Sequence, residues 1–269
     1  MGADLFERYP DWTAAADAVL GYSIRELCVD DPRNELGLTQ FTQPALYVVN
    51  ALTYRAKRDD GMAEPAFVAG HSLGEYDALL AAGCFDFATG LTMVKERGRM
   101  MGQVSGGGMA AVIGMEPARI KEVLQGSEVG RRVDVANFNS FDQTVIAGPK
   151  VDLDTVKADF EAAGVRAYIP LNVSAPFHSR YMREPQMTFD GFLQSFTFAA
   201  PRIPVISNVT ARPYAGNQVR QTLSEQIGNS VQWLDTILFL MQQPEPEFVE
   251  CGPGSVLAKL NVAIKKKLR

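Results

Sequence analysis

The chain has 269 residues, of which 46% are hydrophobic and 21% are charged, and this composition excludes a disordered, collagen-like or low-complexity protein. Its 26 Lys and Arg residues stand against 31 Asp and Glu residues, and the resulting net charge of −5 excludes a broad basic surface for nucleic acid. The length fits one large domain, or a domain with a smaller insert.

The cysteine spacing and the length of the apolar stretches indicate the cellular compartment of the protein. Cys28, Cys84 and Cys251 are widely spaced and form no C-x-x-C pair, so neither a disulfide framework nor a zinc site is expected. No apolar stretch reaches the ~20 residues that a membrane span needs. Residues 1–8 lack the basic and apolar regions of a secretory signal. We therefore expect a cytoplasmic protein with no metal site, no membrane contact and no nucleic-acid partner.

Strand and helix patterns alternate in the first clearly patterned part of the chain. A strand is predicted at residues 67–70, a helix at 75–82 and a longer helix at 87–104. Four small residues at 105–108 (SGGG) interrupt the last helical pattern and predict a hinge.

The segment after this hinge, residues 109–174, predicts a small α+β subdomain. Its elements are a strand at residues 109–114, a helix at 116–125, strands at 133–138 and 144–147, a helix at 154–163 and a strand at 165–173. The order β-α-β-β-α-β is that of a ferredoxin-like fold.

The C-terminal part returns to alternating elements. They are a strand at residues 203–207, helices at 219–227 and 233–242, a strand at 247–250 and a helix at 255–267. Such alternation predicts a parallel sheet with helices on both faces. The expected fold class is α/β, with a large subdomain of residues 1–108 and 175–269 and the α+β subdomain inserted in it.

The motif with the clearest chemistry is GHSLG at residues 70–74, which lies between a predicted strand and a predicted helix. Small residues two before and two after Ser72 allow the sharp turn that exposes a nucleophilic hydroxyl at a helix N-terminus. A Gly-Ser-Gly turn is often only a turn, but the flanking strand and helix favour a nucleophile elbow.

A serine nucleophile needs a base, and the chain has two histidines. His71 lies beside the serine in the elbow, where its side chain would point away from the Ser72 hydroxyl, so it is a poor base. His178 lies in a turn-forming stretch directly after the small subdomain and is the remaining candidate. No Asp or Glu stands out as the group that orients its imidazole, and a backbone carbonyl could take that role.

Five motifs carry a wider resemblance. They are GHSLGE at residues 70–75, RG at 97–98, PFHS at 176–179, EQIGNSVQW at 225–233 and ECGPG at 250–254. Together they resemble the malonyl-CoA:acyl carrier protein transacylase family, and look most like its discrete, trans-acting members that serve polyketide synthases. The resemblance covers nearly the whole chain and implies an α/β-hydrolase-like parallel-sheet core with a ferredoxin-like insert.

The resemblance also implies roles for single residues. Ser72 would accept a malonyl group from malonyl-CoA with His178 as its base, and would pass it to the phosphopantetheine thiol of an acyl carrier protein. The main-chain carbonyl of Gln226 would hold the histidine, with Gln226 and His71 as supporting residues. The family needs no metal and no cofactor besides malonyl-CoA as substrate. A monomer is favoured.

Arg97 matches the family arginine that pairs with the free carboxylate of malonyl. A guanidinium group binds a planar carboxylate through two parallel hydrogen bonds, which lysine cannot do. Without the family alignment, Arg97 would be interpreted as a solvated helix residue beside Lys95, Glu96 and Arg99.

One feature departs from the family pattern. The family opens with a strand and a Gly-x-Gly-Ser-Gln turn whose glutamine lines the active site, whereas this sequence begins at Met1-Gly2, which aligns with the end of that segment. If the segment is absent, the core loses a strand and the backbone N–H of Leu73 is the one assignable oxyanion donor. One such donor contributes about 3 to 4 kcal/mol.

Two other functions remain open. An acyl hydrolase of the same fold would clear acyl groups from carrier proteins, although a hydrolase of neutral chains gains nothing from a carboxylate-binding Arg97. A catalytically silent module that docks carrier proteins is the second alternative. A general serine esterase is disfavoured, because no acid is marked between Ser72 and His178.

Overall fold

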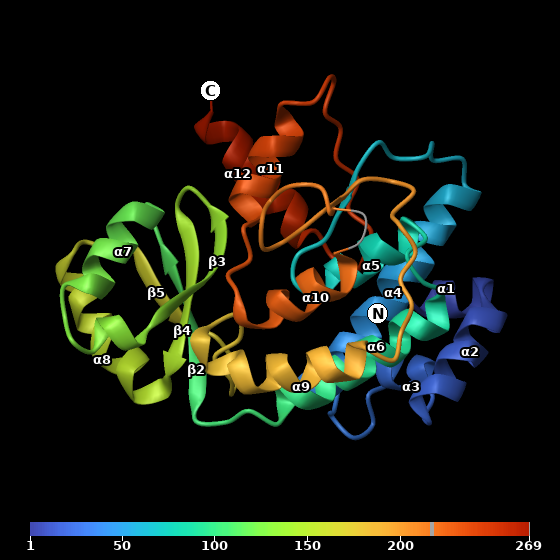
Figure 1. Ribbon diagram of the computed structural model, residues 1–269, viewed down its shortest axis with the longest axis horizontal. Coiled ribbons are helices and arrows are strands. Elements are labelled where there is room, and N and C mark those ends of the chain that lie inside the picture. The colour runs from blue at the N-terminus through green and yellow to red at the C-terminus, as the bar shows by residue number, and fades with distance from the viewer. Residues whose placement is uncertain (216–217, 269) are drawn as a thin grey trace.

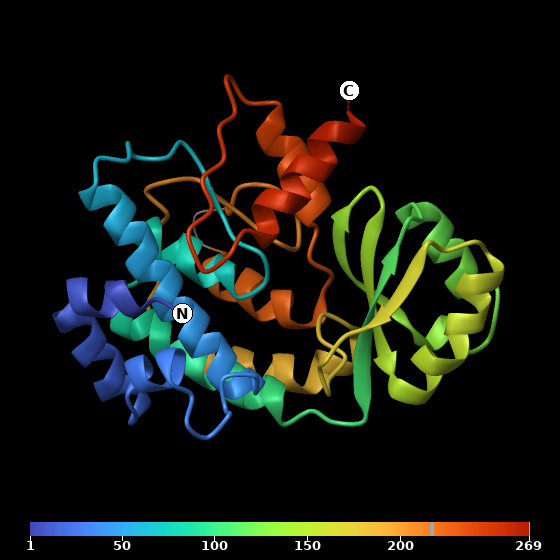
Figure 2. The same cartoon turned by 180° about the vertical axis from the view of Figure 1, so that it is seen from behind.

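Two sheets that share no strand organise the fold in this computed structural model, which describes residues 1–215 and 218–268. The first sheet pairs two short parallel strands, β1 (Val68–Ala69) and β6 (Val205–Ile206). The second has four antiparallel strands in the order β3-β4-β2-β5. Figures 1 and 2 show the second sheet and its two helices as a smaller lobe at one end of the molecule, beside a larger, mostly helical lobe.

The smaller lobe has the predicted ferredoxin-like order of elements. These are β2 (Gly107–Ile113), α7 (Pro117–Gln125), β3 (Asp134–Ser140), β4 (Gln143–Pro149), α8 (Lys150–Ala162) and β5 (Ala167–Pro170), with the short 3-10 helix η1 (Gly130–Arg132) before β3. The inner strand β2 pairs antiparallel with both β4 and β5. The exact division of the chain into residues 109–174 and the remainder stays a prediction.

Alternation along β2 explains how this sheet is covered on both faces. Ala110 and Val112 point to one face, where they pack with Ile120 of α7 and Phe160 of α8. Met109 and the other residues of opposite parity point to the second face and pack near Val173 and Phe177, on the side of the larger lobe. Side chains of a strand alternate with a period of two, so one short strand serves both cores.

Helices dominate the larger lobe. They are α1 (Ala3–Arg8), α2 (Pro10–Leu20), α3 (Ile24–Val29), α4 (Thr39–Asp59), α5 (Gly74–Ala81), α6 (Phe87–Gly102), α9 (Arg183–Leu193), α10 (Val219–Gly228), α11 (Trp233–Met241) and α12 (Val256–Lys267), with the 3-10 helix η2 (Arg180–Met182) before α9. The sequence patterns predict no element before residue 67, whereas α1 to α4 occupy most of residues 3–59. None of the helices described is long and apolar enough to cross a membrane.

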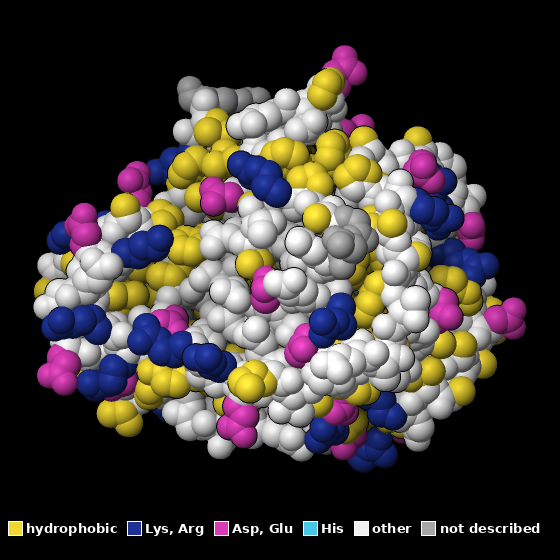
Figure 3. All heavy atoms as spheres, viewed as in Figure 1, with side chains coloured by type: hydrophobic (Ala, Val, Ile, Leu, Met, Phe, Trp, Pro, Cys, Tyr) yellow, Lys and Arg dark blue, Asp and Glu magenta, His cyan; other side chains and the backbone are white. Residues whose placement is uncertain are grey.

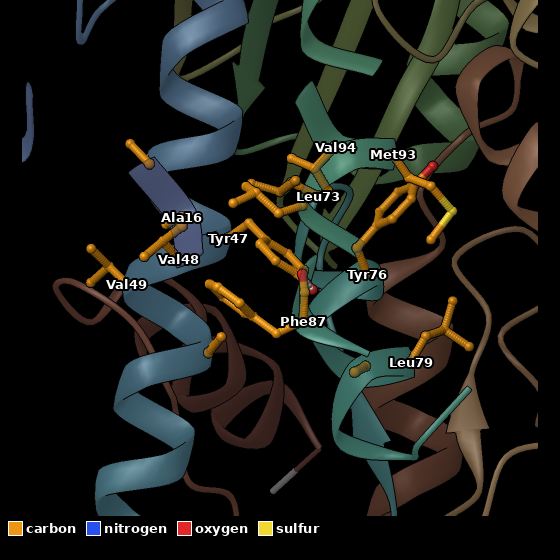
Figure 4. Close-up of a cluster of buried hydrophobic side chains, with 14 of the residues drawn as sticks. Ala16, Tyr47, Val48, Val49, Leu73, Tyr76, Leu79, Phe87, Met93 and Val94 are labelled. Carbon is orange, nitrogen blue, oxygen red and sulfur yellow. Dashed lines mark hydrogen bonds between the residues drawn. The ribbon is translucent and has the colours of Figure 1, made fainter. Parts of the chain in front are cut away.

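The core of the larger lobe lies where α4 packs on α5 and α6. Figure 4 shows Tyr47 of α4 directed toward Phe87, whose carbonyl accepts a hydrogen bond of 3.2 Å from the Tyr47 hydroxyl. Gly90 permits this approach, because a Cβ at that position would lie 2.1 Å from the Tyr47 hydroxyl oxygen. Both α4 and α6 also pack against α5, and the candidate nucleophile Ser72 lies directly before α5.

Two sequence-based expectations differ from the structure. The predicted strand at residues 247–250 is not a strand in the described structure, because no other strand lies beside it, and Phe248 and Val249 are 39% and 51% exposed. The hinge is shorter than predicted, since Gly107 and Gly108 already belong to β2. A Cβ on Gly107 would lie 2.4 Å from Cδ of Pro176, so this glycine allows β2 to pass close to the segment that leads to His178.

Candidate active site

The turn between β1 and α5 has the geometry of the predicted nucleophile elbow. Ser72 has a φ of +50°, a left-handed conformation that is costly for a residue with a side chain. Gly70 must lack a side chain, because a Cβ there would lie 1.9 Å from the carbonyl carbon of Gly74. Asn208 holds the turn: its Oδ1 accepts from the Ser72 N–H at 2.6 Å and its Nδ2 donates to the Gly70 carbonyl at 2.6 Å. The strained serine is therefore supported on both sides.

His178 reaches the Ser72 hydroxyl although 106 residues separate the two in sequence. Its Nε2 lies 2.8 Å from Ser72 Oγ, and its Nδ1 lies 2.9 Å from the main-chain carbonyl oxygen of Gln226. A carbonyl only accepts hydrogen bonds, so Nδ1 carries the proton and Nε2 offers its lone pair to the hydroxyl. The orienting carbonyl that the family resemblance implied is present in the structure.

The imidazole is held in its neutral form. Burial, together with the nearby positive charge of Arg97, lowers the pKa of His178 to about 3. The residue is 4% exposed. His178 is therefore a proton acceptor, and not a cation, at neutral pH.

Arg97 projects from α6 onto the same hydroxyl. Its NH2 group donates to Ser72 Oγ at 3.2 Å and to Oε1 of Gln226 at 2.8 Å, and its NH1 group donates to Oε1 of Gln43 at 2.5 Å. The side chain is 1% exposed, and burial lowers the pKa of its guanidinium. The interpretation of Arg97 as a solvated helix residue is thus wrong, whereas Arg99 does pair with Glu96 at the surface.

The Arg97 guanidinium retains hydrogen-bonding capacity. Of its five N–H groups, three donate within the described structure. Its Nε has no partner among the described residues, and the ring of Tyr76 lies 5.6 Å from the guanidinium carbon. A buried cation with free donors next to a nucleophile is suited to bind an anionic group of a substrate.

Sequence reasoning missed a buried acid in this site. Glu75 is 0% exposed, and its carboxylate accepts from the Asn208 N–H at 3.0 Å, the Tyr214 hydroxyl at 2.6 Å and Nε2 of Gln226 at 2.5 Å. Burial raises its pKa to about 7 even though these three hydrogen bonds and the charge of Arg97 act in the opposite direction. The sequence signal that could have identified Glu75 is an acidic residue in the first helical turn after the elbow.

Asn208 and Gln43 were missed as well. Asn208 follows β6, and the carboxyl ends of two parallel strands meet at one edge of a sheet, so a polar residue there was a candidate neighbour of the elbow after β1. Gln43 lies inside α4, and no pattern in the sequence distinguishes it.

His71 faces away from the hydroxyl, as expected. Its Nε2 lies 2.8 Å from Oδ1 of Asn139 in β3, and its ring packs 5.7 Å from that of Trp233. Burial lowers the pKa of His71 as well. Since Asn139 belongs to the smaller lobe, His71 connects the elbow to that lobe and does not compete with His178 as the base.

Comparison with known proteins decides the family. The acyl transferase domain family matches residues 1–267. The chain belongs to this family. It is 52% identical to polyketide biosynthesis protein ThaF of Burkholderia thailandensis over 97% of this chain and 22% of ThaF. It is 49% identical to polyketide biosynthesis malonyl CoA-acyl carrier protein transacylase BaeC of Bacillus velezensis over 99% of this chain and 92% of BaeC. The chain thus spans less than a quarter of ThaF and most of BaeC.

Solved structures agree with this assignment. The crystal structure of malonyl CoA-acyl carrier protein transacylase from Burkholderia pseudomallei superposes with a TM-score of 0.96 at 50% identity, covering 99% of this chain and 93% of that one. A malonyl-transacylase solved in complex with a type II polyketide synthase acyl-carrier protein gives a TM-score of 0.94 at 34% identity, over 99% of this chain and 88% of that one. The α/β fold expected from the sequence is confirmed.

A cleft between the two lobes of this acyl transferase domain reaches His178. It has a volume of about 640 Å³, and its lining includes His178, Lys121, Arg131 and Asn229. Two backbone hydrogen bonds join the lobes beside it. The Phe138 N–H donates to the Val231 carbonyl, and the Val231 N–H donates to the Ala136 carbonyl in β3. Lys and Arg side chains are frequent on the smaller lobe, at the left of Figure 3.

Proposed function

We propose that this chain is a malonyl-CoA:acyl carrier protein transacylase. It moves a malonyl group from malonyl-CoA, through an ester on Ser72, to the phosphopantetheine thiol of an acyl carrier protein in polyketide or fatty acid biosynthesis. One observation carries the proposal: Ser72 Oγ lies within hydrogen-bond distance of both His178 Nε2 and Arg97 NH2. The names of the relatives support the substrate and the partner.

In the first half-reaction, His178 Nε2 takes the proton of the Ser72 hydroxyl as the oxygen attacks the thioester carbonyl of malonyl-CoA. The imidazolium donates from Nδ1 to the Gln226 carbonyl, which stabilises its charge. Its proton then passes to the sulfur of coenzyme A, the carbon–sulfur bond breaks, and malonyl remains esterified to Ser72.

The second half-reaction repeats these steps with another thiol. His178 takes the proton from the phosphopantetheine thiol, the sulfur attacks the ester carbonyl, and the Ser72 oxygen leaves and recovers the proton. We assign the oxyanion donor to the N–H of Leu73, the residue before α5, which makes no hydrogen bond within the described residues. All transferred protons and electron pairs belong to Ser72, His178 and the substrates, so the reaction needs no cofactor.

Arg97 has two effects on a malonyl substrate. Its free N–H groups bind the carboxylate and fix the acyl chain beside Ser72. The bound carboxylate also offsets the positive charge that lowers the pKa of His178, so His178 is a stronger base with malonyl bound than with a neutral acyl group. Both effects favour malonyl over acetyl.

The partner thiol would enter through the cleft between the lobes. The cleft reaches His178, and Lys121 and Arg131 in its lining provide positive charge near the path of a phosphate-bearing pantetheine arm. We also place the protein in the cytoplasm, where coenzyme A thioesters and carrier proteins are made.

Intact mass spectrometry tests the proposal. Wild-type chain mixed with malonyl-CoA should gain one malonyl group, acetyl-CoA should react far more slowly, and Ser72→Ala should abolish the adduct. Added carrier protein bearing phosphopantetheine should then remove the group and become malonylated. Rapid loss of the adduct to water without carrier protein would identify a hydrolase, and a folded chain that binds carrier protein but forms no adduct would identify a docking module.

A further inference from the structure

One side-chain amide lies between two buried charged groups. The Oε1 of Gln226 accepts from Arg97 NH2 at 2.8 Å, while its Nε2 donates to the Glu75 carboxylate at 2.5 Å and to the Ser72 carbonyl at 2.7 Å. Arg97, Glu75 and Gln226 are each 1% exposed or less. The carboxylate and the guanidinium therefore occupy opposite ends of the same amide, out of contact with solvent.

The contacts of Glu75 favour its ionised form. Its second oxygen accepts from the Asn208 N–H and the Tyr214 hydroxyl, so three donors point at the carboxylate. Hydrogen bonds donated to a carboxylate stabilise the charged form. Arg97 forms no direct ion pair in the described part of the chain, and Glu75 is the carboxylate whose charge acts on it. Burial acts in the opposite direction and raises the pKa of Glu75 to about 7, so in its ionised form Glu75 is a counter-charge held one amide away from the cation.

We propose that Glu75 is a positioning residue for substrate selection. Through Gln226 it holds the guanidinium of Arg97 beside Ser72 without forming an ion pair with it. The free N–H groups of Arg97 consequently remain available to the carboxylate of the acyl group. A direct ion pair would occupy the same donors and compete with the substrate. The role rests on the proposed transacylase function and extends it to a residue outside the reacting atoms.

Donor and acceptor geometry predicts the effect of Glu75→Gln. An NH2 group in place of the oxygen that faces Gln226 would bring two donors together, and the reverse orientation would place it against the Asn208 N–H. Gln226 can relieve the first conflict only by turning its own NH2 toward Arg97. Either way the guanidinium loses its acceptor or its counter-charge, although the side chain keeps its shape.

The test compares the rates at which malonyl-CoA and acetyl-CoA acylate Ser72, followed by intact mass. We expect Glu75→Gln to lower the malonyl-to-acetyl rate ratio by about tenfold or more. General loss of stability slows both reactions alike and leaves this ratio unchanged. Tyr214→Phe is the matched control: it removes a hydrogen bond to the other carboxylate oxygen but leaves the charge and the contact with Gln226, so its ratio should stay within about threefold of wild type.

A second variant keeps the proposal testable if Glu75→Gln does not fold. Gln226→Met removes the connecting amide while Glu75 and the main-chain carbonyl that holds His178 remain, and it should lower the ratio as well. An unchanged ratio in either folded variant, or an equal fall in Tyr214→Phe, would overturn the role of Glu75 alone. Absence of any malonyl adduct on the wild-type chain would instead overturn the transacylase function, and the role of Glu75 with it.

Discussion

Replacement of Arg97 by alanine should slow the reaction with malonyl-CoA but not the reaction with acetyl-CoA. In the wild-type chain the guanidinium is buried and retains unused N–H groups beside Ser72. A malonyl carboxylate gains a charged partner there, whereas an acetyl group leaves the cation without one. Arg97→Ala removes that partner, and it also removes a charge that lowers the pKa of His178.

The expected change in the malonyl-to-acetyl rate ratio follows from the burial of the Arg97 guanidinium. Loss of one partner of a buried, hydrogen-bonded charge pair costs about 2 to 5 kcal/mol. Each 1.4 kcal/mol is tenfold, so the malonyl-to-acetyl ratio should fall on the order of 30-fold to several thousand-fold. The acetyl reaction itself should stay near its wild-type rate or rise, because His178 becomes a stronger base without the neighbouring cation.

Rates of adduct formation at several concentrations of each thioester, read by intact mass, measure this ratio. Arg99→Ala is the control: Arg99 lies on the same helix two residues later, but its side chain is 48% exposed and pairs with Glu96. Circular dichroism establishes that both variants are folded. A folded Arg97→Ala chain that keeps the wild-type preference for malonyl would refute the reasoning.

Two further predictions concern the elbow and the base. Gly70→Ala should lower the free energy of unfolding by several kcal/mol, because the new Cβ would collide with the backbone of Gly74. Gly74→Ala is the control and should change it by less than about 1 kcal/mol, because a Cβ there meets nothing within 4 Å. Equal losses of stability in urea unfolding would contradict this prediction. Burial lowers the pKa of His178 from 6.5 to about 3, so only the unfolded state takes up this proton as the pH falls from 6.5 toward 3, and folding weakens. Between pH 7 and pH 4, wild type should therefore lose about 3 kcal/mol more than His178→Gln, and parallel losses would refute the neutral, buried imidazole.

Local sequence patterns predicted much of the fold and part of the site. Each element of the smaller lobe is a short segment with its own hydrophobic period, and its β-α-β-β-α-β order can be read without knowledge of distant contacts. The elbow is equally local, since the turn needs a glycine at Gly70 and a strand and helix on either side of Ser72. His178 could be predicted as the base because the sequence has two histidines and the other, His71, lies beside Ser72 in the elbow.

The strand predicted at residues 247–250 shows the limit of such patterns. An apolar run becomes a strand only where another strand accepts its backbone hydrogen bonds, and that neighbour belongs to tertiary structure. The helices of residues 3–59 show the reverse case. They were not assigned from the sequence, yet α4 packs along α6 and forms much of the core.

The remaining site residues depend on contacts between distant segments. Asn208 is 136 residues from Ser72, and Gln226 is 151 residues from Glu75. A buried hydrogen-bond network is defined by which donors face which acceptors after packing, and a single sequence contains no record of those pairs. The orienting partner of His178 is a main-chain carbonyl, which every residue has, so no side chain marks it. The sequence by itself therefore determined the nucleophile, its turn and the smaller lobe, because these depend on neighbours along the chain. Tertiary structure alone decided that a buried glutamate faces Gln226 and that Arg97 is desolvated, because both depend on which surfaces exclude water.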